Sequence, residues 1–279
     1  MNDERIISAS IVLYNTSLDQ LELVINSFNP SKLRILFVVD NSPKKNKKIE
    51  LLMNKFKFTN YIFTNKNNGY GAGHNIAIKK AIEVNTQYHV VLNPDLKFDS
   101  MIIDKIADFM DSNNDIAQVM PKILDGNGNI QYLCKLIPSP IDLILKRFLP
   151  KSIFKKNAFR YQLKFADYQR KMNVPYLSGC FMFFRTSAFN KVGLFDERFF
   201  MYPEDIDITR RMHKIYMTVY YPDVTVIHNH SAESYKTIKM LIVHTFNIIK
   251  YFNKWGWFFD KERKEINMRI LDELNYNKR

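Results

Sequence analysis

The sequence predicts an α/β fold in which helices flank a mostly parallel central sheet. Four short apolar runs rich in branched side chains each end in a polar turn, and a helix-compatible segment follows the turn. Connections of this kind favour parallel strands that are joined through covering helices. With 279 residues, of which 46% are hydrophobic, the chain is long enough to fill a large core.

The first four strands are expected in the N-terminal half of the chain. Their apolar runs cover residues 6–13, 34–39, 61–64 and 89–92. The polar turns that end them are Tyr14-Asn15-Thr16, Asp40-Asn41-Ser42, the segment 65–73 and Asn93-Pro94-Asp95. Helices are expected over residues 21–28, from about His74, and over residues 101–110. Ligands bind at the carboxyl ends of the strands in such sheets, so all four turns are expected at the ligand edge.

The second half of the chain contains a basic insertion between further strands. A run over residues 116–124 leads into a turn at 125–129, and short strands are expected at 174–184, 217–221 and 224–227. Between residues 135 and 171, ten Lys or Arg stand against two acids and are interleaved with apolar residues. This pattern indicates a segment that could lie on an anionic surface. Two helices are expected at residues 238–253 and 258–275.

Net charge and cysteine content limit the partners and the compartment. A formal charge of +13 indicates an anionic partner such as nucleic acid, a nucleotide or sugar phosphate, or an acidic lipid surface. Cys134 and Cys180 lie far apart without metal-ligand spacing, which fits a reducing compartment. The first residues lack the form of a signal peptide, and no run of eighteen apolar residues occurs. We therefore expect a cytoplasmic protein that does not span a membrane.

The glycine cluster from Gly69 to Gly73 does not match two common nucleotide-binding motifs. Its spacing is Gly-x-Gly-x-Gly after the third predicted strand, whereas a dinucleotide site needs Gly-x-Gly-x-x-Gly after the first strand. No Gly-x-x-x-x-Gly-Lys-Ser/Thr is present, so a P-loop is excluded. The cluster predicts either a close approach of the backbone to a ligand at a helix start or a plain tight turn.

Acidic residues at two turns are candidates for chemistry. The predicted helix in the stretch 199–211 starts with three acids, Glu204, Asp205 and Asp207. A carboxylate there could cap the helix or act as a general base, and the last acid could pair with Arg210 or Arg211. Asp95 could cap a helix or bind a hard cation together with a diphosphate. His228 ends a strand at what should be the same edge, so it could assist Asp95.

Taken in order, these motifs resemble glycosyltransferase family 2, of GT-A fold, and most closely its bacterial rhamnosyltransferase-like branch of surface polysaccharide synthesis. The resemblance covers residues 6 to about 260. It rests on Val39-Asp40-Asn41-Ser42, Asn67 to Asn75, Leu92-Asn93-Pro94-Asp95, Ser178-Gly179, Gly193 to Glu197, Phe199 to Asp207, and Val226-Ile227-His228. Each motif alone is weak, whereas the ordered set is specific.

The resemblance implies a role for each residue of the site. It assigns donor binding to Tyr14, Asn15, Asp40, Asn68, Gly69, Asn75, Asn93 and Asp95. It makes Asp205 the catalytic base with Glu204 beside it, and it places Ser178 and Gly179 on the acceptor side. A divalent cation, Mg²⁺ or Mn²⁺, would be held across the diphosphate by Asp95 and His228, with His230 competing for the histidine role. Asn93 replaces the first acid of the family's Asp-x-Asp-like metal motif.

The resemblance also implies a division of the chain. Residues 1–235 would form the GT-A catalytic domain, comprising a nucleotide-sugar half (1–125), a basic acceptor-side or membrane-side insertion (135–172) and an acceptor half with the base (173–235). Residues 236–279 would form basic amphipathic helices. Docking at an anionic membrane surface would suit the residues Lys236, Lys239, Lys250, Lys254, Trp255, Trp257 and Phe258. The alternative for these residues is a solvated basic face over an ordinary core helix.

The implied reaction is inverting transfer of a sugar from a nucleotide diphosphate to a hydroxyl of a polyprenyl-diphosphate-linked saccharide at the inner face of the cell membrane. It would serve O-antigen, capsule or cell-wall polysaccharide synthesis. We expect dTDP-L-rhamnose as the donor, and a UDP-hexose is the alternative. Nucleic-acid binding is an alternative from charge alone, but the chain carries no such motif and acids at the strand ends repel phosphates. A catalytically silent sugar-nucleotide-binding subunit is disfavoured because both Asp95 and Asp205 are present.

Overall fold

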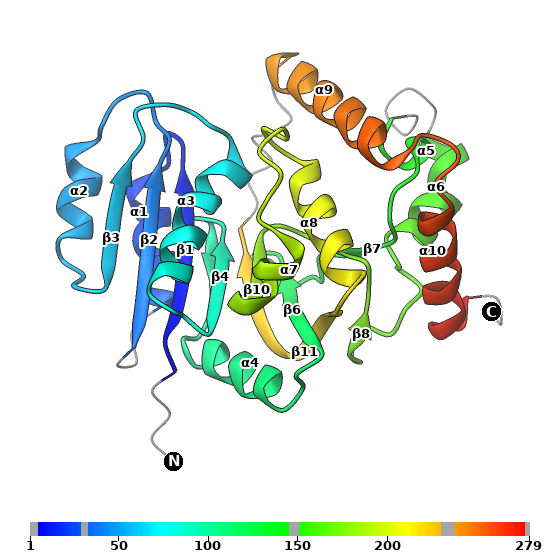
Figure 1. The fold of residues 1–279 in the computed structure, drawn as a ribbon, viewed down its shortest axis with the longest axis horizontal. Helices are drawn as coiled ribbons and strands as arrows, with labels where there is room; N and C mark the ends of the chain where they lie inside the picture. The colour runs from blue at the N-terminus through cyan, green and yellow to red at the C-terminus, as the bar shows by residue number, and fades with distance from the viewer. Residues whose placement is uncertain (1–4, 29–32, 145–150, 230–237, 277–279) are drawn as a thin grey trace.

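A central sheet with helices on both faces forms the body of the protein (Figure 1). The computed structural model describes residues 5–28, 33–144, 151–229 and 238–276. Within these residues the main sheet has nine strands, in the order β3-β2-β1-β4-β10-β6-β11-β5, with β8 paired to β11. Their bounds are Ile7–Leu13 (β1), Arg34–Asp40 (β2), Thr59–Phe63 (β3), Tyr88–Leu92 (β4), Leu96–Lys97 (β5), Ile116–Leu124 (β6), Met172–Asn173 (β8), Phe181–Arg185 (β10) and Met217–His228 (β11). Two short strands, Cys134–Lys135 (β7) and Tyr176–Leu177 (β9), pair separately.

The predicted parallel arrangement of the first four strands is confirmed. β1 pairs in parallel with β2 and β4, β2 pairs in parallel with β3, and β6 pairs in parallel with β11. Antiparallel β10 lies between β4 and β6, and antiparallel β5 pairs with the end of β11. The four polar turns consequently lie at one edge of the sheet, at the top of Figure 1.

The helices connect the strands and cover the sheet. They are Leu18–Ser27 (α1), Lys47–Met53 (α2), Tyr70–Glu83 (α3), Met101–Asp111 (α4), Pro140–Leu143 (α5), Lys151–Tyr161 (α6), Phe189–Val192 (α7), Pro203–His213 (α8), Ile238–Trp255 (α9) and Lys261–Glu273 (α10). Alternate strand residues enter cores on opposite faces. Leu36 and Val38 join the cluster that contains α1 and α4, whereas Phe37 and Val39 pack on α3. Among the described residues, no helix combines the length and apolar composition needed to cross a bilayer.

Three element boundaries differ from the predictions. α3 starts at Tyr70, before His74, because Gly69 adopts φ +92° and ends the preceding loop. α10 starts only at Lys261, where the Asp260 side chain accepts the backbone N–H of Arg263. The two strands predicted at 217–221 and 224–227 form one strand, β11, with an irregularity between Tyr221 and Thr225. Pro222 explains that irregularity, since proline cannot donate to a strand ladder.

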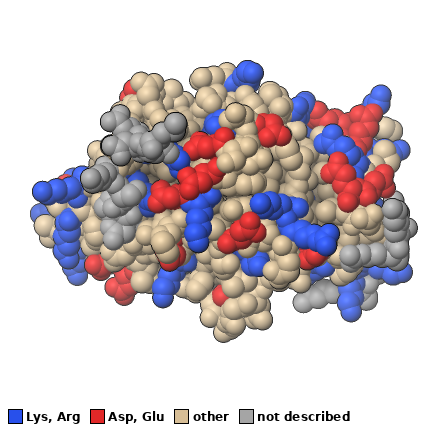
Figure 2. Space-filling model, turned by 90° about the horizontal axis from the view of Figure 1, so that it is seen from below, with Lys and Arg blue, Asp and Glu red and all other residues tan. Residues whose placement is uncertain are grey.

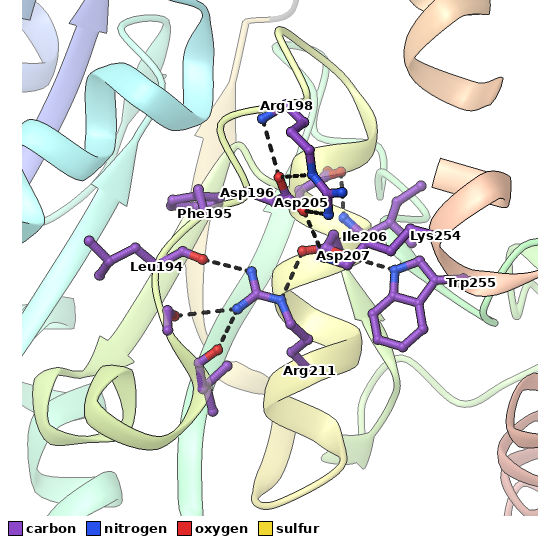
Figure 3. A network of polar contacts seen from close by, with 12 residues as sticks. Leu194, Phe195, Asp196, Arg198, Asp205, Ile206, Asp207, Arg211, Lys254 and Trp255 are labelled. Atoms are coloured by element: carbon purple, nitrogen blue, oxygen red, sulfur yellow. Dashed lines mark hydrogen bonds and ion pairs between the residues drawn. The ribbon is translucent and has the colours of Figure 1, made fainter. Parts of the chain in front are cut away.

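Buried ion pairs attach the C-terminal helices to α8. Arg210 is almost fully buried, pairs with Asp260 at 2.7 Å and Glu262 at 2.7 Å, and stacks on the Trp255 ring at 4.0 Å. The predicted alternatives for Asp207 are thereby resolved, because Arg210 is engaged elsewhere. Asp207 accepts a hydrogen bond from Arg211 at 2.8 Å, and its other oxygen accepts one from the Trp255 indole at 2.8 Å (Figure 3).

Surface charge is mixed on the side where β1 begins. Figure 2, which views the molecule from below, shows Lys and Arg interspersed with Asp and Glu over this side. The excess positive charge therefore does not form one continuous patch there. A nucleic-acid groove lined by charge of one sign is not visible on this face.

We expect Asp260→Ala to lower the free energy of unfolding by about 3–5 kcal/mol, because it removes one of the two carboxylates that pair with buried Arg210 and also removes the N-cap of α10. Chemical denaturation measures the change. Lys261→Met is the matched control, since it removes only an exposed pair with Glu265 at 3.7 Å. This control should cost at most about 0.5 kcal/mol. A loss below about 1 kcal/mol for Asp260→Ala would contradict the anchoring role.

Candidate active site

The nucleoside end of the candidate site lies at the ends of β1 and β2. Asp40 is fully buried, and its carboxylate accepts hydrogen bonds from the Tyr61 hydroxyl at 2.6 Å and the Ser42 amide at 2.9 Å. Tyr14 directly follows β1, whose last residue is paired with Asp40, and its side chain is exposed. The Asn15 amide donates to Ser42 Oγ at 3.0 Å. The structure thus brings the predicted residues of these two turns together.

The glycine cluster allows protein segments to pack closely. A Cβ on Gly69 would lie 2.2 Å from the carbonyl oxygen of Phe200, in the loop before α8. A Cβ on Gly73 would lie 2.7 Å from Val12 of β1. The cluster is therefore more than a plain tight turn, because it lets the start of α3 approach both β1 and the loop that leads into α8.

Asp95 and His228 meet at the carboxyl end of the sheet, as predicted. Asp95 Oδ1 and His228 Nε2 are 3.3 Å apart, and Asp95 Oδ1 is buried and accepts no hydrogen bond from the described residues. Gln131, which the sequence did not single out, donates from its amide nitrogen to the His228 carbonyl at 2.9 Å. Its amide oxygen then faces His228 Nδ1 at 3.1 Å. Gln131 thereby fixes the orientation of the His228 ring, so that Nε2 faces Asp95.

The Asp95 and His228 pair fits a divalent cation. Asp95 Oδ1 and His228 Nε2 face each other at 3.3 Å, so a carboxylate oxygen and an imidazole nitrogen, both ordinary metal ligands, are within reach of one cation. Gln131 would act as the partner that orients a ligating histidine. No cluster of three or more metal-ligating side chains occurs among the described residues, so most ligands would come from a bound diphosphate and water. His230 lies outside the described residues.

The carboxyl groups of Glu204 and Asp205 are buried in the first turn of α8. Tyr202 precedes them at φ +90°, a strained conformation for a residue with a side chain. Its ring packs edge-on against His244 of α9, with centroids 4.4 Å apart. Pro203 then occupies the first helical position, where a missing N–H is tolerated. This entry to α8 fixes where the two carboxyl groups point.

Asp205 is held by three hydrogen-bond donors. The Gly179 amide donates to Oδ2 at 2.9 Å, the Tyr176 hydroxyl donates to the same oxygen at 3.3 Å, and the Ile206 amide donates to Oδ1 at 2.8 Å. A Cβ on Gly179 would lie 3.1 Å from the Asp205 Cβ, so glycine permits this contact. The predicted acceptor-side residue Gly179 therefore contacts the predicted base. Its neighbour Ser178 is half-buried in the same loop.

Burial separates the two carboxyl groups electrostatically. Burial raises the pKa of Asp205 to about 6, while nearby Lys135 and the three donors act to lower it. Burial, followed by repulsion from Asp205, holds the pKa of Glu204 well above its usual range. Among the described residues Glu204 Oε2 has no hydrogen-bond partner. At neutral pH we therefore expect an ionised Asp205 next to a protonated Glu204.

Tyr70 connects the two ends of the site, and sequence reasoning did not identify it. Its hydroxyl lies 3.1 Å from Asn93 Oδ1 and 2.7 Å from the Gly179 carbonyl. Through these contacts the start of α3 contacts the turn that holds Asp95 and the loop that holds Asp205. The local sequence does not assign Tyr70 this role, because its partners Asn93 and Gly179 follow β4 and precede β10.

Asn75 and Asn68, both predicted to shape the donor site, differ in burial. Asn75 is buried in α3, where its amide exchanges hydrogen bonds with the Phe195 backbone and donates to Glu197 at 2.9 Å. It thus fixes the segment before α8 and does not face the open edge. Asn68 is half-buried in the loop before Gly69.

A family model for glycosyl transferase family 2 matches residues 8–193, which carry most of this site. The chain belongs to glycosyl transferase family 2. It is 32% identical over 184 residues to the N-acetylglucosaminyl-diphospho-decaprenol L-rhamnosyltransferase of Mycobacterium tuberculosis, over 61% of this chain and 58% of the relative. It is 28% identical over 152 residues to the low-salt glycan biosynthesis hexosyltransferase Agl10 of Haloferax volcanii, over 54% of this chain and 45% of that protein. The matches span about half the length of these curated relatives.

Solved structures share the fold of this family 2 protein at low sequence identity. GalNAc-T7 with UDP, GalNAc and Mn²⁺ matches with a TM-score of 0.60 at 15% identity, over 82% of this chain and 45% of that one. S. aureus TarS 1-349 in complex with UDP matches with a TM-score of 0.58 at 16% identity, over 95% of this chain and 70% of that one. The predicted GT-A fold, with a mostly parallel central sheet flanked by helices, is confirmed.

The environment of Asp205 predicts the effect of pH on glycosyl transfer. A base must be ionised, so the rate should fall as pH decreases through the Asp205 pKa of about 6. Asp205→Asn should lower kcat by about 10²–10⁴-fold and remove this acid limb. Near-normal turnover by this variant would exclude the role of base.

Thermal unfolding of Asp205→Asn provides the control for misfolding. The pKa of Asp205 is about 6 in the folded state and 3.8 in the unfolded state. Folding therefore becomes less favourable as pH rises from about 4 to about 6, and at neutral pH the ionised carboxylate lowers the stability of the protein. The variant should therefore keep or raise Tm at neutral pH. A lower Tm would indicate that the variant loses activity because its folded state is destabilised.

Proposed function

We propose that this family 2 protein is an inverting, metal-dependent glycosyltransferase. Its donor would be a nucleotide-diphospho-sugar, and dTDP-L-rhamnose is the preferred candidate. Its acceptor would be a hydroxyl of a polyprenyl-diphosphate-linked saccharide. One observation supports this proposal above all: the Tyr70 hydroxyl contacts both ends of the site. One end is the turn that leads to Asp95, which faces His228, and the other is the loop whose Gly179 amide binds Asp205. The similarity to a decaprenol-linked rhamnosyltransferase supports both substrates.

In the proposed reaction Asp205 accepts the proton of the acceptor hydroxyl. The hydroxyl oxygen forms a bond to the anomeric carbon while the bond from that carbon to the donor phosphate breaks on the opposite side, so the configuration inverts. A protonated Glu204 beside the base would keep a second negative charge out of the site. When bound, a divalent cation held by Asp95 and His228 would supply charge neutralisation to the departing diphosphate.

A second donor class, a UDP-hexose, has its own support. One relative is a hexosyltransferase, and two fold neighbours were crystallised with UDP. Asp40, Tyr14 and Asn15 line the edge where the nucleoside would lie in either case. The nucleobase and the sugar of the donor therefore have to be identified by experiment.

Thermal stabilisation by a panel of nucleotide sugars with Mn²⁺ tests donor and metal together. A donor at 100 times its Kd stabilises the protein by about 2.7 kcal/mol, which raises Tm by several degrees. dTDP-L-rhamnose should give the largest shift, and EDTA should abolish it. Asp95→Asn should lose the shift, whereas Asp115→Asn, at an exposed site, should keep it. An EDTA-insensitive shift would remove the metal role given to Asp95 and His228.

We also propose a peripheral position at the inner face of the cell membrane, through a set of residues that shares Phe258 with the predicted one. Lys254 is engaged with Asp196 and Asp207, and Trp255 donates to Asp207, so both face inward (Figure 3). Lys236 and the side chain of Lys239 lie outside the described part of the chain. Exposed apolar residues of this region are Leu241, Ile242 and Phe246 on α9, Phe258 and Phe259 before α10, and Met268 on α10.

Positive charge accompanies the second of these apolar groups. Phe258 and Phe259 are 75% and 99% exposed, and they line a cavity of about 700 Å³ together with Arg160, Lys261 and Lys264. Aromatic side chains next to cations suit the interface of an anionic bilayer. The C-terminal helices thus combine attachment to α8 with an exposed surface of the chemistry expected for membrane contact.

Cosedimentation with vesicles of phosphatidylglycerol and phosphatidylcholine tests the membrane contact. The protein should be retained at low salt and released at high salt. Replacing Phe258 and Phe259 by Ser should reduce retention several-fold, while Leu51→Ser, at an apolar site on α2 that is 65% exposed, should not. Equal retention of both variants would exclude the Phe258–Phe259 turn as the membrane contact.

A further inference from the structure

Lys135 lies beside the candidate base although nothing in its local sequence marks it. It belongs to β7, which pairs with β9 so that Lys135 stands opposite Tyr176. Its ammonium lies 4.8 Å from the centroid of the Tyr176 ring, and the side chain is half-buried. The Tyr176 hydroxyl in turn donates to Asp205 Oδ2 at 3.3 Å. The pairing of two short strands thus places a cation next to the carboxylate.

The position of Lys135 differs from that of the donor diphosphate. A continuous series of contacts leads from Asn93 through the Tyr70 hydroxyl to Gly179, and from Gly179 through Asp205 to Tyr176. Asp95, which faces His228, follows Asn93 at one end of this series of contacts, and Lys135 packs on Tyr176 at the other. The base therefore stands between the proposed cation site and this lysine. Phosphates of the donor need no second cation at the Lys135 end.

Lys135 and Asp205 lie beside a buried hydrophobic cluster that holds Tyr176 in place. Tyr176 belongs to a hydrophobic cluster with Ile248, Tyr251 and Phe252 of α9, against which Leu143 and Ile144 are packed. A saccharide joined through a diphosphate to a polyprenyl chain presents a sugar, then anionic phosphate, then hydrocarbon. Asp205 and Lys135 thus offer a base and a cation side by side, for the hydroxyl of a sugar and the phosphate attached to that sugar.

We infer that Lys135 binds the phosphate of the lipid-linked acceptor and thereby places the sugar hydroxyl at Asp205. This inference rests on the proposed function, because it takes the diphosphate-linked acceptor from there. A point charge on a flexible stem is suited to a phosphate that moves away with the product. The role is one of binding and positioning, since the lysine accepts no proton in the reaction.

Binding of farnesyl diphosphate in the presence of EDTA tests the inference without requiring sugar transfer. EDTA removes any cation at Asp95 and His228, so the donor end contributes little. The unchanged protein should bind farnesyl diphosphate in a calorimetric titration and bind farnesol at least tenfold more weakly. Lys135→Met should weaken farnesyl diphosphate binding at least tenfold, and Lys135→Arg should stay within about threefold of the unchanged protein.

Lys171→Met is the matched control. Lys171 also packs on aromatic rings, 4.6 Å from the Phe109 centroid and 4.9 Å from that of Tyr221, but away from Asp205. This variant should bind farnesyl diphosphate like the unchanged protein. Equal affinity of Lys135→Met and the unchanged protein, equal losses in the two Met variants, or equal binding of farnesol and its diphosphate would each overturn the inference. Failure of the proposed function would appear separately, as absence of sugar transfer or donor binding.

Discussion

Burial of two adjacent carboxyl groups at the start of α8 is the constraint on which the rest of the site depends. An ionised carboxylate away from water is stable only when hydrogen-bond donors surround it. Asp205 receives donors from Gly179, Ile206 and Tyr176, whereas Glu204 receives repulsion from its neighbour. This asymmetry assigns the negative charge to Asp205. It also places the pKa of Asp205 close to the range in which a base works best.

Such an arrangement requires that α8 cannot move, and the C-terminal helices provide this restraint. Arg210 and Asp207, both buried on α8, are engaged by Asp260 and by Trp255 respectively. Strain at Tyr202 is tolerated because α9 packs on its ring. The C-terminal helices, for which the sequence left both membrane docking and an ordinary core helix open, are therefore part of the scaffold of the site. Their exposed apolar side chains then link that scaffold to the proposed membrane contact.

Separation of charge along the site follows from the same geometry. In the proposed site Asp95 and His228 would hold a cation at one end, and Lys135 supplies positive charge at the other. Tyr70 and Asp205 lie between them. Two phosphate-bearing substrates could thus bind on opposite sides of one base without competing for the same cation. The net charge of +13 says little about this, since the position of each charge decides its effect.

Sequence alone determined the strands β1 to β4, the single ligand edge and the residues at the strand ends, because apolar periodicity and turn chemistry act over a few residues. It also supplied the ordered motifs that indicate the family. Only the tertiary structure decided which partners these residues meet. Arg210 finds Asp260 fifty residues away, His228 finds Gln131 at a separation of 97, and Lys135 reaches Asp205 through the pairing of β7 with β9. Such contacts depend on the packing of distant elements, which no local pattern encodes.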